Sequence, residues 1–198
     1  MKIGLTGSIA CGKSTVSAYL RSLGYHVADA DAVSRSLTAD GGEALPLVRE
    51  AFGSAVFDGE TLSRRRLGDL VFSDPAALER LNALLHPLII ARVQKELDAF
   101  DAPDALVFGD IPLLYECGME TLFDRIWVVH APRDVQIARL LERDGLDAQQ
   151  ARQRIDAQMP LEEKCRRADT VISTAGTIDQ TRAQIDAHLL ALSQRRPT

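Results

Sequence analysis

Short apolar runs alternate along the chain with longer segments in which apolar residues recur every three or four positions. Such runs, bounded by turn residues, predict buried strands. We predict strands at residues 3–6, 25–28, 105–108, 125–130 and 170–173. A predicted helix over 13–23, which ends at Gly24, follows the first strand. Strands that alternate with helices predict the α/β class, here a five-stranded parallel sheet flanked by helices.

The interval 34–100 breaks this alternation, because it contains several helical segments and no convincing strand. Asp74 and Pro75 are typical of a helix start, with an acidic N-cap followed by proline. We expect that helix to kink or restart at Pro87, because proline removes a backbone donor. We therefore predict a core at 1–33 and 101–198 with an all-helical insertion between its second and third strands.

Composition and charge narrow the classes of partner. The 198 residues carry a net charge of −5, which disfavours a general nucleic-acid binder. No apolar stretch approaches the length of a membrane span, and the first residues do not resemble a signal peptide. The three cysteines form no C-x-x-C pair, which suits reduced thiols. We expect a cytoplasmic protein that binds small molecules, neither nucleic acid nor membrane, as a monomer or weak homo-oligomer.

A phosphate-binding motif follows the first predicted strand. Residues 7–14, GSIACGKS, match G-x-x-x-x-G-K-[ST] without a gap and open a predicted helix. Gly7 and Gly12 permit close backbone approach, and the N–H groups of the loop face anionic oxygens. Lys13 would supply charge to the β- and γ-phosphates, Ser14 a hydroxyl to Mg²⁺, and Thr15 a hydroxyl to the α-phosphate. The motif predicts a nucleoside triphosphate with Mg²⁺, but by itself it does not separate a switch, a motor and a kinase.

Two residues inside this loop, Ala10 and Cys11, are expected to contact phosphate through backbone N–H groups, so their side chains should not block binding. Cys11 also lies beside the start of the predicted helix, where the pKa of a thiol falls. We therefore expect Cys11 to react with alkylating agents unless nucleotide is bound.

Acidic residues follow two of the predicted strands, where ligands of α/β sheets lie. Asp31 is our candidate general base, whereas Asp29 is either a second functional carboxylate or a helix N-cap. Asp110 either reaches Mg²⁺ through water or caps a strand end. Arg35, one helical turn after Asp31, either meets an anionic acceptor or pairs with Asp31.

In series, these segments resemble the dephospho-coenzyme A kinase family of P-loop kinases. The matching segments are GLTGSIACGKST (4–15), DADAVSR (29–35), LLHP (84–87), DIPLLYE (110–116) and WVVHAPRDVQIARLLERD (127–144). Residues 157–158 and 168–173 also fit the pattern. The resemblance covers nearly the full length of the chain, in order and with the spacing of the family.

The resemblance implies a P-loop kinase core, a helical subdomain at 34–100 for the acceptor, and a mobile lid at about 132–167. Asp31 matches the base that acts on the ribose 3′-hydroxyl of dephospho-CoA. His86 and Pro87 match the hinge-like end of a long helix, and Arg139 and Arg143 match lid arginines that close over the ATP phosphates. The residues implied on the acceptor side are Asp31, Arg35, His86 and Pro112.

The implied reaction moves the γ-phosphoryl group of ATP to that 3′-hydroxyl, giving coenzyme A and ADP. The alternative is a nucleoside or nucleotide monophosphate kinase. A GTP switch would need an N-K-x-D segment, which the sequence lacks. The chain departs from the family at Ser173 and Thr174, where an Asp-Asn pair is usual, so no role for an asparagine side chain carries over there.

Overall fold

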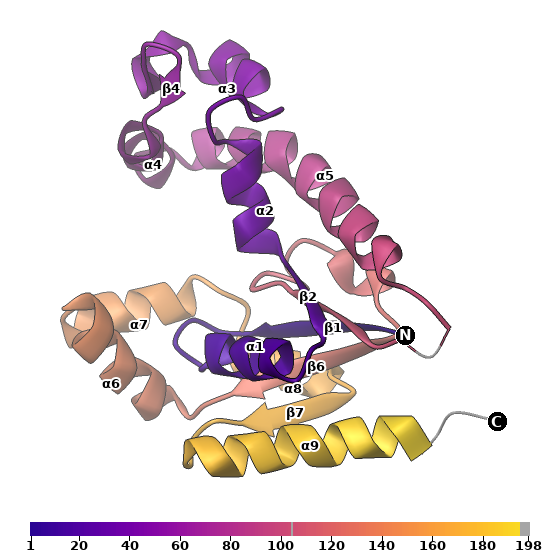
Figure 1. Ribbon diagram of the computed structural model, residues 1–198. Helices are drawn as coiled ribbons and strands as arrows, with labels where there is room; N and C mark the ends of the chain where they lie inside the picture. The colour runs from indigo at the N-terminus through magenta and orange to yellow at the C-terminus, as the bar shows by residue number, and fades with distance from the viewer. Residues whose placement is uncertain (104, 195–198) are drawn as a thin grey trace. The chain divides into compact units, whose positions relative to one another are not determined.

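The computed structural model describes residues 1–103 and 105–194, which divide into two units (Figure 1). The core unit comprises Met1–Ala28 and Phe100–Thr198, and the helical unit comprises Asp29–Ala99. The helical unit begins at Asp29, earlier than the predicted residue 34. Asp31, which the prediction placed in the core, therefore belongs to the helical unit together with Arg35.

The core unit is built on a five-stranded sheet with the order β2-β5-β1-β6-β7. Strand β1 pairs in parallel with β5 and β6, and β6 pairs in parallel with β7. The parallel sheet confirms the predicted fold class. Its strands are β1 (Lys2–Gly7), β2 (His26–Asp29), β5 (Val107–Asp110), β6 (Arg125–His130) and β7 (Thr170–Ser173).

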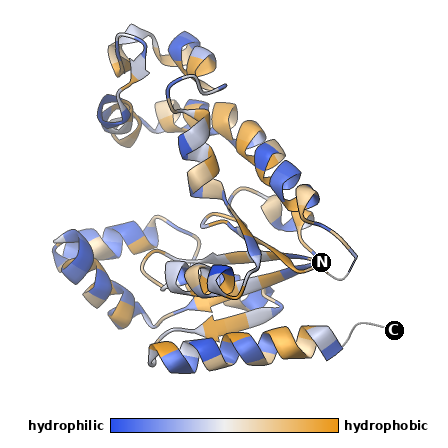
Figure 2. Ribbon diagram, viewed as in Figure 1, coloured by the Kyte–Doolittle hydropathy of each residue, from blue (hydrophilic) through white to orange (hydrophobic). Residues whose placement is uncertain are grey.

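Helices cover the sheet and explain why its strands are apolar on both faces. Ile3 and Leu5 of β1 are fully buried in one cluster with Leu20 of α1 and Ile185 of α9. In Figure 2, α9 alternates hydrophobic and hydrophilic residues along its length, as an amphipathic helix does. The helices of the core unit are α1 (Lys13–Ser22), α6 (Arg133–Asp144), α7 (Ala148–Asp156), α8 (Leu161–Arg167) and α9 (Ile178–Gln194), with a 3₁₀ turn η2 (Met119–Leu122).

Two glycines in neighbouring strands make room for an aromatic ring. A Cβ on Gly4 would lie 2.9 Å from a ring carbon of Phe123, and one on Gly109 would lie 2.6 Å from another. Gly4 and Gly109 are register partners in β1 and β5. Because a Cβ at either site would clash with the ring, glycine is required here by packing.

The helical unit is not all helical, which corrects the prediction. Strands β3 (Phe57–Asp58) and β4 (Thr61–Leu62) form a small antiparallel hairpin. Two residues per strand are too few to produce a pattern of period two, so the hairpin has no recognisable signal in the sequence. The helices are α2 (Ala30–Leu37), α3 (Leu45–Phe52), α4 (Arg64–Ser73) and α5 (Pro75–Ala99), with a 3₁₀ turn η1 (Ser54–Val56).

Helix α5 continues through Pro87, contrary to the expected restart. The helix runs from Pro75 to Ala99, so His86 and Pro87 lie near its middle and not at its end. Val93 and Leu97, beyond the proline, are fully buried. The apolar face of α5 packs on α2, α3 and α4, and this burial offsets the backbone hydrogen bond that proline removes.

Candidate nucleotide site

The phosphate loop joins β1 to α1 with left-handed backbone at two positions. Ala10 has φ 58° and Gly12 has φ 87°. A Cβ on Gly12 would lie 3.0 Å from the Thr174 hydroxyl, and one on Gly7 would lie 2.7 Å from the Val129 carbonyl oxygen. Both glycines of the motif are thus required by close packing, and Gly12 also by its φ.

The ammonium group of Lys13, at the start of α1, forms an ion pair with Asp110 at the end of β5. Asp110 is buried, and its other oxygen accepts a hydrogen bond of 2.6 Å from the Ser17 hydroxyl. Asp110 is therefore more than a strand-end cap, because it joins the phosphate-loop lysine to β5. Ser17 lies one turn beyond Lys13 on α1, outside the phosphate-loop motif, and no sequence pattern distinguishes it.

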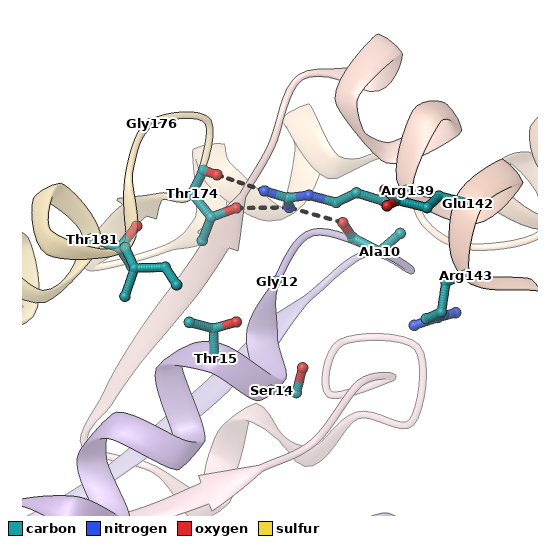
Figure 3. Close-up of a pocket in the computed structure, with 11 residues that line it drawn as sticks. Ala10, Gly12, Ser14, Thr15, Arg139, Glu142, Arg143, Thr174, Gly176 and Thr181 are labelled. Carbon is teal, nitrogen blue, oxygen red and sulfur yellow. Dashed lines mark hydrogen bonds between the residues drawn. The ribbon is translucent and has the colours of Figure 1, made fainter.

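A cavity of about 480 Å³ opens beside the loop, and its lining comes entirely from the core unit (Figure 3). Gly12, Ser14 and Thr15 form one side, and residues of α6 face them. The chain after β7 closes the remaining side. The lining residues are Ala10, Gly12, Ser14, Thr15, Arg139, Glu142, Arg143, Thr174, Gly176, Ile178 and Thr181.

Arg139 extends from α6 across this cavity and binds both the loop and the end of β7 (Figure 3). Its guanidinium donates to the Ala10 carbonyl at 3.1 Å, the Thr174 hydroxyl at 3.1 Å and the Thr174 carbonyl at 2.7 Å. The Thr174 hydroxyl in turn donates to the Cys11 carbonyl at 2.6 Å. Thr174, the departure from the family pattern, thus joins the phosphate loop to the predicted lid arginine.

Arg143, the second predicted lid arginine, also lines the cavity but is held differently. Its guanidinium makes a bidentate ion pair with Asp144, in which the two nitrogens donate to the two carboxylate oxygens at 2.7 and 2.9 Å. Hydrogen bonding to this carboxylate raises the pKa of Arg143 and lowers that of Asp144. The Arg143 side chain is largely exposed, so the pair is readily exchanged for an anionic ligand.

The structure contradicts the expected reactivity of Cys11. Its side chain is 1% exposed and belongs to the main apolar cluster. Burial raises the pKa of this thiol, although the Lys13 backbone N–H and nearby cations act in the opposite direction. Desolvation raises the pKa of the thiol more than the start of the helix lowers it, because the side chain points into the core and not toward solvent.

The predicted acceptor-side residues of the helical unit lie on α2 and α5. The Asp29 side chain accepts from the Ala32 N–H at 2.9 Å, so Asp29 is the N-cap of α2. Asp31 lies in the first turn of α2, beyond the expected strand tip, and its side chain is exposed. Arg35 follows one turn later on the same helix, also exposed. His86 lies in the middle of α5.

Pro112, a predicted contact of the acceptor, has a carbonyl with structural partners. That oxygen accepts from the Thr6 hydroxyl at 3.0 Å and from the Lys164 ammonium at 3.1 Å. No sequence pattern distinguishes Lys164, because a lysine in the charged segment LEEKCRR resembles an ordinary solvated residue. Gln158 belongs to a segment that fits the family pattern but carried no expected role; its Oε1 accepts from the Ile9 N–H at 2.7 Å.

Divalent-metal ligands are sparse in the core. Within residues 1–103 and 105–194, no three acidic, histidine or cysteine side chains cluster in a way that could hold a metal ion.

Across the described part of the chain, none of the helices combines the length and the apolarity that crossing a bilayer requires.

Known proteins resemble this chain along nearly its whole length. The sequence profile of the family described as dephospho-CoA kinase matches residues 1–180. A dephospho-CoA kinase of Symbiobacterium thermophilum is 44% identical over 189 residues, covering 93% of this chain and 78% of that relative. One of Anaeromyxobacter dehalogenans is 45% identical over 193 residues, covering 96% of this chain and 91% of that relative.

Solved structures agree with the sequence comparisons. A Thermus thermophilus protein has a TM-score of 0.82 at 39% identity, covering 97% of both chains. The dephospho-CoA kinase from Campylobacter jejuni has a TM-score of 0.74 at 28% identity, covering 98% of both chains. A shikimate kinase from Acinetobacter baumannii has a TM-score of 0.57 at 18% identity, covering 99% of this chain and 95% of that one, and supports the fold alone.

Proposed function

This chain belongs to the dephospho-CoA kinase family, and we propose that it transfers the γ-phosphoryl group of ATP to the ribose 3′-hydroxyl of dephospho-CoA. The products are coenzyme A and ADP. The observation that carries the proposal is the family match over residues 1–180, which includes both the phosphate loop and segment 29–35. The cavity beside the loop supports the nucleotide half of the reaction, because it joins backbone donors to two arginines.

In this proposal, ATP binds with its phosphates against the loop. The Lys13 ammonium group moves from Asp110 to the β- and γ-phosphates. There its positive charge stabilises the departing ADP. The loop contributes backbone N–H groups, and the Thr15 hydroxyl reaches the α-phosphate. The nucleotide-binding residues proposed here are Ala10, Cys11, Gly12, Lys13, Ser14, Thr15 and Arg143.

The arginines of α6 act on the transferring group. Arg139 is already oriented by Thr174 and the Ala10 carbonyl. It can therefore stabilise the negative charge of the γ-phosphoryl oxygens with little further loss of conformational entropy. Arg143 exchanges Asp144 for phosphate. Because phosphoryl transfer depends almost entirely on positioning and electrostatics, these two cations are proposed to supply much of the acceleration.

Mg²⁺ would be held by the Ser14 hydroxyl and, through water, by the Asp110 carboxylate. Ser14 is exposed at the start of α1, and Asp110 is a buried carboxylate beside Lys13. When bound, Mg²⁺ would neutralise charge on the β- and γ-phosphates. The chain's own contribution is to keep one hydroxyl and one carboxylate available when Lys13 turns to the phosphates.

Asp31 is proposed as the general base. Its carboxylate accepts the proton of the 3′-hydroxyl as the hydroxyl oxygen bonds to the γ-phosphorus, and the bond from that phosphorus to the bridging oxygen breaks with its electron pair going to ADP. The support is an exposed carboxylate on the first turn of α2 within a segment that matches the family. Arg35, on the next turn, is proposed to bind the acceptor together with His86 and Pro112.

We place the reaction in the cytoplasm, with the chain acting as a monomer or weak homo-oligomer. Among the described residues, Cys11, Cys117 and Cys165 are thiols and form no disulfide, which is typical of a reducing compartment. The proposed partners are two small molecules, ATP and dephospho-CoA.

The acceptor assignment is tested by measuring ADP release from Mg-ATP with dephospho-CoA, AMP, CMP and shikimate as separate acceptors. We expect turnover only with dephospho-CoA, and mass spectrometry should find coenzyme A as the product. Turnover with AMP or CMP but not with dephospho-CoA would instead identify a nucleotide kinase.

A further inference from the structure

A second lysine lies behind the phosphate loop, and the proposed reaction gives it no role. Lys164 of α8 is fully buried, with no exposed surface. Its ammonium contacts the Gly7 carbonyl at 3.4 Å, the Pro112 carbonyl at 3.1 Å and the Glu116 carboxylate at 2.8 Å. A buried cation is costly unless all its donors are used, so three acceptors explain how it is tolerated but not why it is there.

The two charges of this pair are in different environments. The Glu116 side chain retains 22% of its exposure, whereas Lys164 retains none. Water therefore screens the carboxylate more than the ammonium, and the positive charge dominates on the side of the phosphate loop. Burial raises the pKa of the neighbouring loop residue Cys11, and Lys164 is among the cations that partly oppose this shift.

Lys164 also fixes the geometry of the loop. Its bond to the Gly7 carbonyl orients the peptide plane where β1 becomes the loop. Gln158 fixes the next residues, because its Oε1 accepts from the Ser8 hydroxyl at 3.0 Å and from the Ile9 N–H at 2.7 Å. The Met159 N–H donates to Glu116 at 3.1 Å. Gln158, in the segment that leads into α8, and Lys164 of α8 thus hold the loop in place through their side chains.

We propose that Lys164 is a positioning residue of the phosphate site, which orients the loop and adds a buried positive charge to the field that binds triphosphate. Glu116 tunes that field by partly neutralising it. The proposal rests on the Mg-ATP half of the proposed function and is independent of the acceptor. Its consequence is that the two partners of one ion pair have opposite effects on nucleotide affinity.

The test compares Lys164→Met, Glu116→Gln and the double variant in the full-length chain. Methionine matches the lysine stem without its charge, and glutamine keeps an oxygen for both Lys164 and the Met159 N–H. The dissociation constant of Mg-ATP is measured by calorimetry and the thermal midpoint by circular dichroism. We expect Lys164→Met to weaken Mg-ATP binding roughly tenfold and Glu116→Gln to strengthen it about twofold to threefold.

Both single variants should lower the thermal midpoint, because each breaks the same contact. The double variant should bind Mg-ATP more weakly than the wild type but no more weakly than Lys164→Met, because it loses the lysine charge and also the opposing carboxylate charge. Weaker binding in both single variants, in proportion to lost stability, would overturn the proposal and leave Lys164 a structural lysine. If Lys164→Met does not fold, Glu116→Gln still decides, since weaker Mg-ATP binding by this variant contradicts the proposal.

The acceptor does not enter this measurement. A wild-type chain that binds Mg-ATP but does not phosphorylate dephospho-CoA would overturn the proposed function, while the variants still decide the role of Lys164. A wild-type chain that does not bind Mg-ATP would overturn both proposals.

Discussion

In the core unit, the cations proposed to bind phosphate are already held by protein groups, whereas in the helical unit the proposed base Asp31 and the proposed acceptor-binding residue Arg35 are open to solvent. Lys13 contacts Asp110, and Arg139 is held by Thr174 and the Ala10 carbonyl. By contrast, Asp31 and Arg35 are exposed on α2. The two halves of the proposed reaction are therefore prepared to different degrees.

The difference has a physical meaning. Groups oriented before the ligand arrives stabilise developing charge without reorganising, so they contribute to both binding and rate. An exposed carboxylate is hydrated until the acceptor displaces water from it, and it then contributes mainly to the chemical step. Changes in the core unit should alter ATP affinity together with turnover, and changes on α2 should alter turnover or acceptor binding without altering ATP affinity.

The sharpest test of this separation is Asp31→Asn. Loss of the base should lower kcat by roughly 10²- to 10⁴-fold, and the dissociation constant of Mg-ATP should stay within about twofold because the nucleotide cavity is lined by the core unit. Steady-state kinetics and calorimetry on the same preparation measure both. Normal turnover by this variant would exclude Asp31 as the base.

Lys13→Ala should affect both kcat and the dissociation constant of Mg-ATP. Removing the charge that serves the β- and γ-phosphates should lower kcat by about 10²-fold and weaken Mg-ATP binding as well. Lys95→Ala, at an exposed position of α5, is the matched control and should behave as wild type. Unchanged ATP affinity in Lys13→Ala would contradict the proposed ion-pair exchange with Asp110.

Thr174→Val should have a smaller effect, confined to the core unit. The substitution keeps the shape but leaves the Cys11 carbonyl without its 2.6 Å donor and releases one of the Arg139 contacts. A lost buried hydrogen bond costs about 1–2 kcal/mol, so kcat/KM for ATP should fall roughly tenfold. Thr174→Ser, which keeps the hydroxyl, should retain most of the wild-type kcat/KM for ATP. An equal loss of kcat/KM in both variants would point to packing alone.

The smallest expected effect concerns Cys11. Because its thiol is buried and burial raises its pKa, Cys11 should resist iodoacetamide at neutral pH both with and without Mg-ATP. Peptide mass spectrometry distinguishes it from the half-buried Cys117 and Cys165. Rapid labelling of Cys11 that Mg-ATP suppresses would show that the loop opens in solution.

Local patterns determine most of the core. The five strands and the helix after the phosphate loop follow from apolar runs and turn residues, with no strand end shifted by more than two positions. The loop itself is determined by the residues at 7–14, since its glycines and its lysine are needed wherever a loop of this kind binds phosphate. The positions of Lys13, Ser14 and Thr15 in this loop therefore follow from the sequence alone.

What depends on distant partners is decided only by the tertiary structure. The continuity of α5 through Pro87 is decided by burial of its later turns, and the burial of Cys11 by the sheet and helices around it. The bonds from Thr174 to Cys11 and from Lys164 to Gly7 join residues more than 150 positions apart. No local pattern encodes such pairs, because a side chain's environment is set by segments that meet only when the chain folds.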